Sequence, residues 1–276
     1  MNDYFSSQVW LLYTEEDNPD SNNPNSALAY QDSFIRYLPE LNKQTNTSHG
    51  ILHFYPYQKA NVLLGAKDTR LPNLNEGVQY LNDLGYPVVV RPHGGLAVVN
   101  DSGILNLALA SDNAIFPLSI DQAYEQMVNL IQSILAPYNV QVEAYEIPDS
   151  YCPGKFDLVI QGKKIGGIAQ RRFKSGVTTA TYLSVNGNQQ VRSELIKHFY
   201  TISKADSSFP QVDPSQMTTI ENMIQAPLST NSLQNQIIQY FKKQTQVTLG
   251  DYQEESLQTI YQKVYPKIIK RSQSIL

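Results

Sequence analysis

A single cysteine, Cys152, is the residue of this sequence best suited to form a covalent bond with a substrate. It lies in the segment Ser-Tyr-Cys-Pro-Gly, where the proline and glycine predict a loop. A buried structural cysteine is more often found in an apolar run. A thiolate can attack a carbonyl carbon and hold the acyl group as a thioester. The residue types therefore allow acyl transfer by a cysteine nucleophile.

The segment after this cysteine is strongly basic. Cations near a thiol stabilise the thiolate and lower the pKa of the thiol. The same pattern also fits a free thiol beside a solvated basic strand, so both interpretations stand at this point. Against one acid, Asp157, the segment carries Lys155, Lys163, Lys164, Arg171, Arg172 and Lys174.

A second candidate segment begins with Arg91-Pro92-His93-Gly94-Gly95 and extends to Asn106. Paired glycines allow a positive φ, or let the backbone approach a ligand closely. They are equally typical of a plain hairpin turn. The segment is thus either a turn or one wall of a binding site.

Several functional classes are excluded by motif and composition. The phosphate-binding and hydrolase motifs GxxxxGK[ST], GxGxxG and GxSxG are absent, and the four histidines have neither HxH nor HExxH spacing. One cysteine allows no internal disulfide and no two-cysteine metal motif. We therefore expect no metal and no cofactor.

The charge balance indicates which partners the chain can bind, and the apolar runs indicate whether it can enter a membrane. Lysine and arginine number 21 and aspartate and glutamate 25, a net charge of -4 that gives no case for nucleic-acid binding. No apolar run approaches 18 residues, and the N-terminus lacks the features of a signal peptide. We expect a cytoplasmic protein that does not bind membranes.

Helical spacing of apolar residues predicts the helices that would position these segments. Asn73 can cap one helix, and Ser119 with Gln122 can form a capping box for another. Pro39 is expected to end a helix, and Pro266 to kink or break the last one. The helices with defined ranges are predicted over residues 26–38, 120–135, 189–200, 217–223, 233–243 and 254–274.

Alternating and continuous apolar runs predict strands between these helices. Gln161-Gly162-Lys163 is expected to form a hairpin turn. Hairpins grouped with helices indicate an α+β fold with mixed or antiparallel sheets and flanking helices. The strands are predicted over residues 51–57, 61–64, 88–90, 96–99, 104–109, 140–147, 156–160, 164–169 and 177–185.

In this order and at this distance, two blocks resemble the lipoate-protein ligase and octanoyltransferase superfamily. The Arg-x-x-Gly-Gly-x-Ala-Val block is residues 91–98, and the Gly-Lys-Lys-Ile-x-Gly-x-Ala block is residues 162–169. The resemblance implies a catalytic domain like that of biotin and lipoyl protein ligases, over about residues 26–250. An N-terminal strand and polar loop would occupy residues 1–25, and a C-terminal helix residues 251–276.

Within the superfamily, the sequence departs from the ATP-dependent ligases. Those enzymes have an Arg-Arg pair, three glycines and a His-Asp pair, where this chain has Pro92, Leu96 and Asn100. The Gly-Gly-Leu-Ala-Val-Val block and the cysteine loop instead resemble the octanoyl-[glycine cleavage H protein]:protein N-octanoyltransferases of lipoate biosynthesis. That resemblance implies transfer of an octanoyl group from a lysine of the H protein to lipoyl-domain lysines on the acyltransferase subunits of 2-oxo acid dehydrogenase complexes.

The resemblance also assigns roles to residues. It implies that Cys152 is the acyl-thioester nucleophile and that Lys164 lowers its pKa. Exchange of one lysine amide for another is nearly thermoneutral, so no ATP is expected. The pairs Gly94-Gly95 and Gly166-Gly167 could form the narrow walls of an apolar slot for the acyl chain. The residues expected to bind the acyl group or the substrate are Arg91, Gly94, Gly95, Asn106, Gly167 and Gln170.

Three rival functions share part of this pattern. A cysteine-dependent octanoyltransferase with octanoyl-acyl-carrier protein as donor would have the same fold, thiol and lysine. A lipoate-protein ligase is disfavoured by the departures above, and a non-catalytic binder of lipoyl domains would need no thiol. The sequence leaves open the acceptor preference, lipoyl transfer and the oligomeric state. The basic segment is further predicted to dock partner proteins, with Arg171 and Arg172 on opposite faces of a strand.

Overall fold

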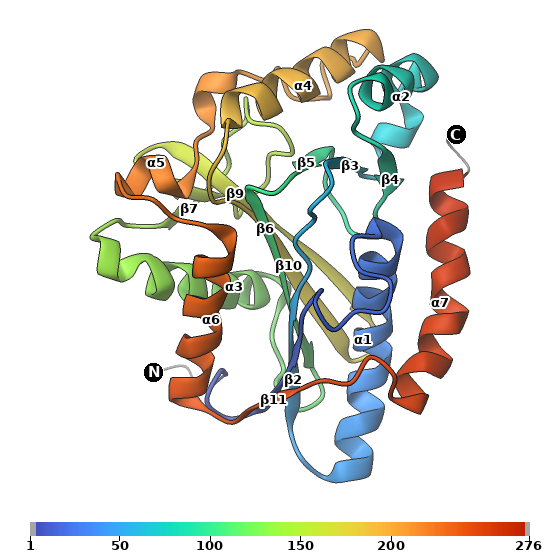
Figure 1. Cartoon of the computed structure of the whole chain (residues 1–276), viewed down its shortest axis with the longest axis vertical. Coiled ribbons are helices and arrows are strands. Elements are labelled where there is room, and N and C mark those ends of the chain that lie inside the picture. Colours follow the sequence, from blue (N-terminus) through green and yellow to red (C-terminus); the bar gives the residue numbers. More distant parts are fainter. Residues whose placement is uncertain (1–3, 274–276) are drawn as a thin grey trace.

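A mixed eight-stranded sheet forms the centre of the computed structural model, which describes residues 4–273 (Figure 1). Its strands are β1 (Val9–Tyr13), β2 (His49–Phe54), β6 (Ile104–Asp112), β7 (Glu143–Ala144), β8 (Leu158–Ile160), β9 (Lys163–Phe173), β10 (Gly176–Ser184) and β11 (Val247–Leu249). The order is β11-β1-β2-β6-β10-β9-β8-β7. β11, β1 and β2 are parallel, and every following pair is antiparallel. The α+β class with a mixed sheet is thereby confirmed.

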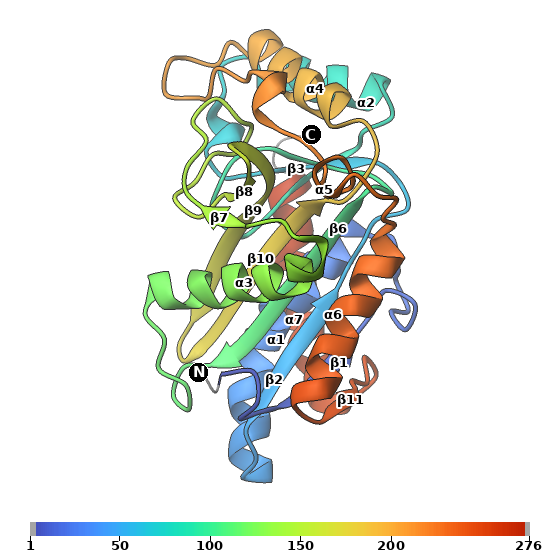
Figure 2. The ribbon, with the colours of Figure 1, turned by 90° about the vertical axis from the view of Figure 1, so that its left-hand side faces the viewer.

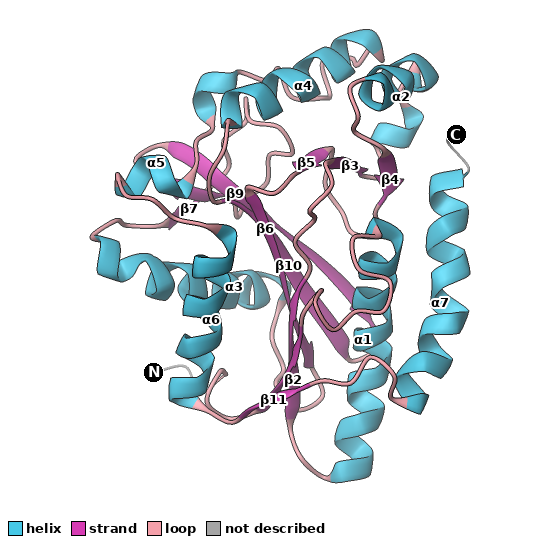
Figure 3. Ribbon diagram, viewed as in Figure 1, coloured by secondary structure: helices cyan, strands magenta, loops and turns pink. Residues whose placement is uncertain are grey.

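A second, three-stranded sheet lies above the first one (Figures 1 and 3). It consists of β3 (Asn61–Leu64), β4 (Val88–Val90) and β5 (Val98–Asn100), with β3 in the middle. Since β4 and β5 lie on opposite sides of β3, the segment 91–97 must cross from one edge to the other. Gly94 and Gly95 therefore belong to a crossing loop, and the expected hairpin turn at this pair is wrong.

Helices cover both faces of the large sheet (Figures 1 and 2). α1 (Pro24–Thr45) and α7 (Glu255–Gln273) pack on one face, and α3 (Ile120–Leu135) and α6 (Thr230–Gln244) on the other. α2 (Leu74–Asp83) and α4 (Gln189–Ile202) cover the small sheet, and the short α5 (Ile220–Ile224) precedes α6. One apolar cluster joins the small sheet to the large one, since Ile104 of β6 and Tyr182 of β10 pack in the same cluster as the strands of the small sheet.

Prolines do not end the two long helices of the first face. α1 continues past Pro39 to Thr45, and α7 continues past Pro266. Pro39 has no N–H to donate to the carbonyl of Ile35, and the backbone of Gly176 lies against that carbonyl instead. A Cβ on Gly176 would come 1.8 Å from Ile35 O. The expectation that Pro39 ends the helix is wrong because packing of the buried face outweighs one lost hydrogen bond.

Other local expectations have mixed outcomes. The capping box of Ser119 and Gln122 is confirmed. The hairpin turn is also confirmed, since Gln161 and Gly162 have φ of 48° and 78°, as a two-residue type I′ turn requires. The side chain of Asn73 makes no capping hydrogen bond. Of the strand expected over 140–147, two residues form β7, and β11 was not expected at all.

The segments before residue 26 and after residue 250 belong to the large sheet and to the helical layer that covers it. β1 lies in the large sheet between β11 and β2. α7 packs along α1, where Leu257 joins Phe34 and Leu38 in one buried cluster. The terminal strand and helix therefore support the same sheet that carries the site.

Candidate active site

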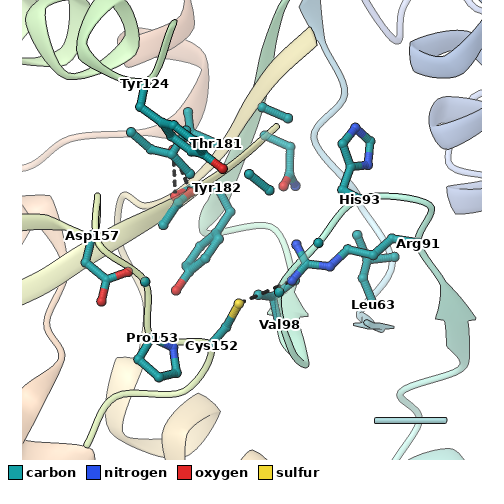
Figure 4. Close-up of a pocket in the computed structure, with 18 of the residues that line it drawn as sticks. Leu63, Arg91, His93, Val98, Tyr124, Cys152, Pro153, Asp157, Thr181 and Tyr182 are labelled. Carbon is teal, nitrogen blue, oxygen red and sulfur yellow. Dashed lines mark hydrogen bonds between the residues drawn. The ribbon is translucent and has the colours of Figure 1, made fainter. Parts of the chain in front are cut away.

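A cavity of about 220 Å³ opens between the two sheets, and Cys152 lies in its wall (Figure 4). Six of the eight predicted site residues line it. Lys164 lies behind the cysteine loop, and the amide of Gln170 donates to the carbonyl of Ile120 at the start of α3. The six that line the cavity are Arg91, Gly94, Gly95, Asn106, Cys152 and Gly167.

The sulfur of Cys152 receives two hydrogen bonds. Arg91 Nη2 donates to Sγ over 3.2 Å (Figure 4). The backbone N–H of Leu96 donates to Sγ over 3.1 Å. Arg91 is 7% exposed, so water screens its charge only weakly. Both donors come from outside the cysteine loop, so they fix the position of the sulfur in the cavity wall.

The backbone of Cys152 is held in a conformation that side chains disfavour. Its φ is 50°, in the left-handed region. Such strain persists only when the surroundings enforce it, and it is common at functional sites. The loop residues 150–154 thus present the sulfur in a fixed orientation.

Lys164 holds the cysteine loop in this conformation through hydrogen bonds from beneath it. Its side chain is fully buried, and Nζ donates to three oxygens of the loop. These are Ser150 Oγ at 3.1 Å, Tyr151 O at 3.0 Å and Cys152 O at 2.7 Å. Among residues 4–273, no hydrogen bond joins Nζ to the sulfur. The role that the resemblance implies for Lys164 stays a prediction, and the geometry adds that of holding the loop.

Asp157 is the counter-charge of Lys164 and was not foreseen as a site residue. Its Oδ1 lies 2.9 Å from Nζ, and its Oδ2 accepts from the N–H of Ile147. Burial raises the pKa of Asp157, although Lys164 acts in the opposite direction. Removing either partner would leave a buried charge unpaired, at a cost of about 3–5 kcal/mol. The one signal in the sequence was that Asp157 is the sole acid in the basic segment.

The loop that carries Leu96 is packed too closely for side chains. Gly95 has φ of 98°, and a Cβ there would come 2.9 Å from the sulfur. A Cβ on Gly65 would come 1.8 Å from Gly95 O. The backbones at Gly65 and Gly95 are in contact, and close packing leaves neither of them room to shift. The loop that carries Leu96 therefore has one position relative to the sulfur.

A buried carboxylate and a tyrosine tie the same loop to α4. Asp68 accepts from the N–H of Gly65 at 2.7 Å and from the hydroxyl of Tyr200 at 3.1 Å. The hydroxyl of Tyr200 in turn accepts from the N–H of Ala97 at 3.3 Å. Burial raises the pKa of Asp68 to about 6. Neither residue carried a sequence signal, because the motif blocks do not include them.

Three buried amides orient Asn106 in the cavity wall. Asn106 Nδ2 donates to Asn100 Oδ1 at 2.9 Å, and Asn100 Nδ2 donates to Asn61 Oδ1 at 3.1 Å. Asn100 stands where the resembling ligases have a histidine. This hydrogen bond uses one N–H of the Asn106 amide. The second N–H and Oδ1 of Asn106 are left for contacts in the cavity, which this residue lines.

Apolar side chains complete the wall away from the sulfur. Gly167 allows the ring of Tyr182 to approach, since a Cβ there would come 2.9 Å from it. The aliphatic residues of the wall are Leu28, Leu63, Val98, Ile168, Ala169 and Ala180. A short hydrocarbon chain fits such a surface better than a polar substrate does.

Within residues 4–273, no group of three or more His, Cys, Asp or Glu side chains is placed to hold a metal ion. None of the helices in that range combines the length and the hydropathy needed to cross a bilayer.

Comparisons with known proteins indicate the family and the fold of the chain. The family model described as lipoyl protein ligase A/B catalytic domain matches residues 23–242. The chain is 39% identical to the lipoyl-[GcvH]:protein N-lipoyltransferase of Listeria monocytogenes over 78% of this chain and 79% of that protein. It is 35% identical to the octanoyl-[GcvH]:protein N-octanoyltransferase of Oceanobacillus iheyensis, over 91% and 90%. A crystal structure of lipoate-protein ligase A bound with ATP has the same fold, with a TM-score of 0.71 and 17% identity over 98% of this chain and 100% of that one.

Proposed function

The chain belongs to the lipoyl protein ligase A/B catalytic domain family, and on that basis we propose that it is an octanoyl-[GcvH]:protein N-octanoyltransferase. In this proposal, the octanoyl group moves from a lysine of GcvH, the glycine cleavage H protein, to lysines on the lipoyl domains of 2-oxo acid dehydrogenase complexes. Cys152 carries the group between them as a thioester. The cytoplasmic location expected from the sequence is part of the proposal.

One observation carries the covalent step. The only cysteine of the chain lies in the cavity, and its sulfur accepts from a buried guanidinium and from a backbone N–H. A protein that merely bound lipoyl domains would need neither a thiol nor two donors directed at it. A ligase that activates its acyl group with ATP would need no thiol either.

In the first half-reaction, the thiolate attacks the carbonyl carbon of the octanoyl-lysine amide. The S–C bond forms, the C–N bond breaks, and the proton that the thiol lost ends on the leaving ε-amine. The oxyanion forms on the carbon bonded to Sγ, two bonds from the sulfur, and in this proposal the donors that point at Sγ, Arg91 and the N–H of Leu96, stabilise it. Donors already fixed in place stabilise that charge without reorganisation.

In the second half-reaction, the amine of an acceptor lysine attacks the thioester carbonyl. The new C–N bond forms, the C–S bond breaks, and the proton that the amine loses replaces the one that Sγ gave up in the first half-reaction. The free energy of one amide is exchanged for that of another, so no cofactor is needed in this scheme. The covalent intermediate also allows donor and acceptor proteins to use the same cavity one after the other.

The acyl chain would lie along the aliphatic wall of the cavity. One relative that matches this chain is named a lipoyltransferase and another an octanoyltransferase. The test therefore compares the octanoyl and lipoyl groups directly. The octanoyl group is the proposed substrate.

Intact-mass analysis tests the proposal. After incubation with octanoyl-GcvH, the wild type gains the mass of one octanoyl group and Cys152→Ala gains none. Addition of an unmodified lipoyl domain then returns the enzyme to its starting mass and acylates the domain. Octanoyl-acyl-carrier protein, lipoyl-GcvH, and octanoate with ATP are run in parallel. Turnover by Cys152→Ala, or a reaction only with ATP or only with the carrier protein, contradicts the proposal.

A further inference from the structure

Most of the basic segment after Cys152 is engaged within the chain. The predicted opposite orientation of Arg171 and Arg172 is confirmed, since one contacts α1 and the other the start of α3. Lys163 and Lys174 make no ion pair with any residue in 4–273. The four contacts are Lys155 with Asp121, Lys164 with Asp157, Arg171 with Asp32, and Arg172 with the carbonyl oxygens of Leu118 and Ser119.

Lys174 borders a groove of about 500 Å³ that segments distant in sequence form together. It lies at the turn between β9 and β10, and the groove runs between α1 and α7 beside it. The floor is apolar, and five cations and one acid line the groove. The floor residues are Ile35, Phe173, Ile260 and Val264, and the charged residues are Arg36, Glu40, Lys43, Lys174, Lys263 and Lys267, which we call the basic groove.

The charge of the basic groove is largely uncompensated. Its four lysines are exposed, and the ion pairs among residues 4–273 include none of them. Lys263 and Lys267 stand one turn apart on α7, where like charges repel and destabilise a helix by about 0.2–0.5 kcal/mol. The whole chain has a net charge of -4, so this is a local concentration of positive charge. An anionic group in the groove would relieve the repulsion.

The basic groove and the catalytic cavity adjoin the same strand, β9. Gly167 to Ala169 of β9 line the cavity, and Phe173 lines the groove. From Ala169 to Phe173 the strand rises about 13 Å, at about 3.3 Å per residue. Over this stretch β9 pairs with β10 on one side, whereas its pairing with β8 ends at Gly166. A domain of about 100 residues has a radius of gyration of about 13 Å, so one that presents a lysine to the cavity also reaches the groove.

We propose that the basic groove docks an acidic face of the proteins whose lysine enters the catalytic cavity. This inference rests on the proposed function. Donor and acceptor must place a lysine in the same cavity in turn, so the groove serves both. Its role is to speed the encounter and to orient the partner, since rim charges act mainly on the association rate.

The test reverses two charges of the groove at a distance from the chemistry. Lys263→Glu with Lys267→Glu is compared with Lys242→Glu with Lys243→Glu, a matched change on exposed lysines in the last turn of α6, on the other face of the sheet. The rate of Cys152 acylation by octanoyl-GcvH is measured by intact mass over a range of NaCl concentrations. Alkylation by iodoacetamide, a small neutral reagent, reports on the folded state and the thiol.

At about 50 mM salt, we expect kcat/KM of the groove variant for octanoyl-GcvH to fall about tenfold or more, and the difference to shrink at high salt. Alkylation and the α6 variant should stay within about twofold of wild type. Lys174→Glu, on a different element, should act in the same direction. Equal acylation by the groove variant and the wild type, or an equal loss in the α6 variant, overturns the inference alone. Failure of the wild type to form an acyl-enzyme overturns the proposed function and the inference together.

Discussion

Arg91→Gln tests which cation activates the thiol of Cys152. Arg91 Nη2 lies 3.2 Å from the sulfur, a separation at which two full charges attract by about 5 kcal/mol at an effective dielectric constant of about 20. Desolvation of a side chain that is 7% exposed offsets much of this attraction. Hydrogen bonds to charged groups contribute about 1.5–3 kcal/mol net. We therefore expect alkylation and acylation of Cys152 to slow by about 10- to 150-fold.

The assay is the second-order rate of iodoacetamide alkylation at neutral pH, with single-turnover acylation by octanoyl-GcvH beside it. Arg91→Lys retains the charge with a less favourable donor geometry, so its rates should lie between those of wild type and Arg91→Gln. Arg70→Gln, on an exposed turn, is the matched control and should match wild type. Thermal unfolding separates loss of reactivity from loss of structure.

The competing explanation is that Lys164 is the activating cation. Lys164→Gln alone would leave Asp157 as an unpaired buried charge, so the fair comparison is Lys164→Gln with Asp157→Asn, which neutralises both partners. Our reasoning is refuted if Arg91→Gln alkylates at the wild-type rate, and most clearly if the double variant is then the slow one. If both variants are slow, the two cations act on the thiol together.

Three further outcomes follow from the buried contacts. Tyr200→Phe leaves the N–H of Ala97 without an acceptor and removes a donor from the buried carboxylate of Asp68. Acylation should therefore slow by about fivefold or more in single-turnover assays, and the free energy of unfolding should fall by about 1–3 kcal/mol. Gly65→Ala drives a methyl group into Gly95 O, so urea titrations should show a loss of about 2 kcal/mol or more and alkylation should slow as well. Burial lowers the pKa of His53 from 6.5 to about 3; the unfolded chain therefore binds more protons between these values, and stability falls as the pH drops below 6.5. At pH 5 this loss is about 2 kcal/mol, and His53→Phe should remove that part of the pH dependence in urea titrations.

Local patterns in the sequence determined several elements and the loop position of the proposed nucleophile. The Ser119 and Gln122 capping box defined the start of α3, and the Gln161-Gly162 pair defined the β8–β9 hairpin, because both depend on residues adjacent in the chain. The loop position of Cys152 followed from its neighbours Pro153 and Gly154. These features need no knowledge of the rest of the molecule.

The surroundings of the sulfur were decided by the tertiary structure. Arg91 lies 61 residues from Cys152 in the chain, and Tyr200 lies 132 residues from Asp68, yet each pair is within hydrogen-bond distance. Spacing in the sequence indicates nothing about such pairs, because the two sheets must first pack together before their loops meet. Packing likewise carried α1 past Pro39, since burying its apolar face stabilises the helix by more than one hydrogen bond. Residue types thus determined that a thiol could act here, and only the packed sheets decided that a guanidinium and a backbone N–H would point at it, because those donors come from segments that are neighbours only in the folded chain.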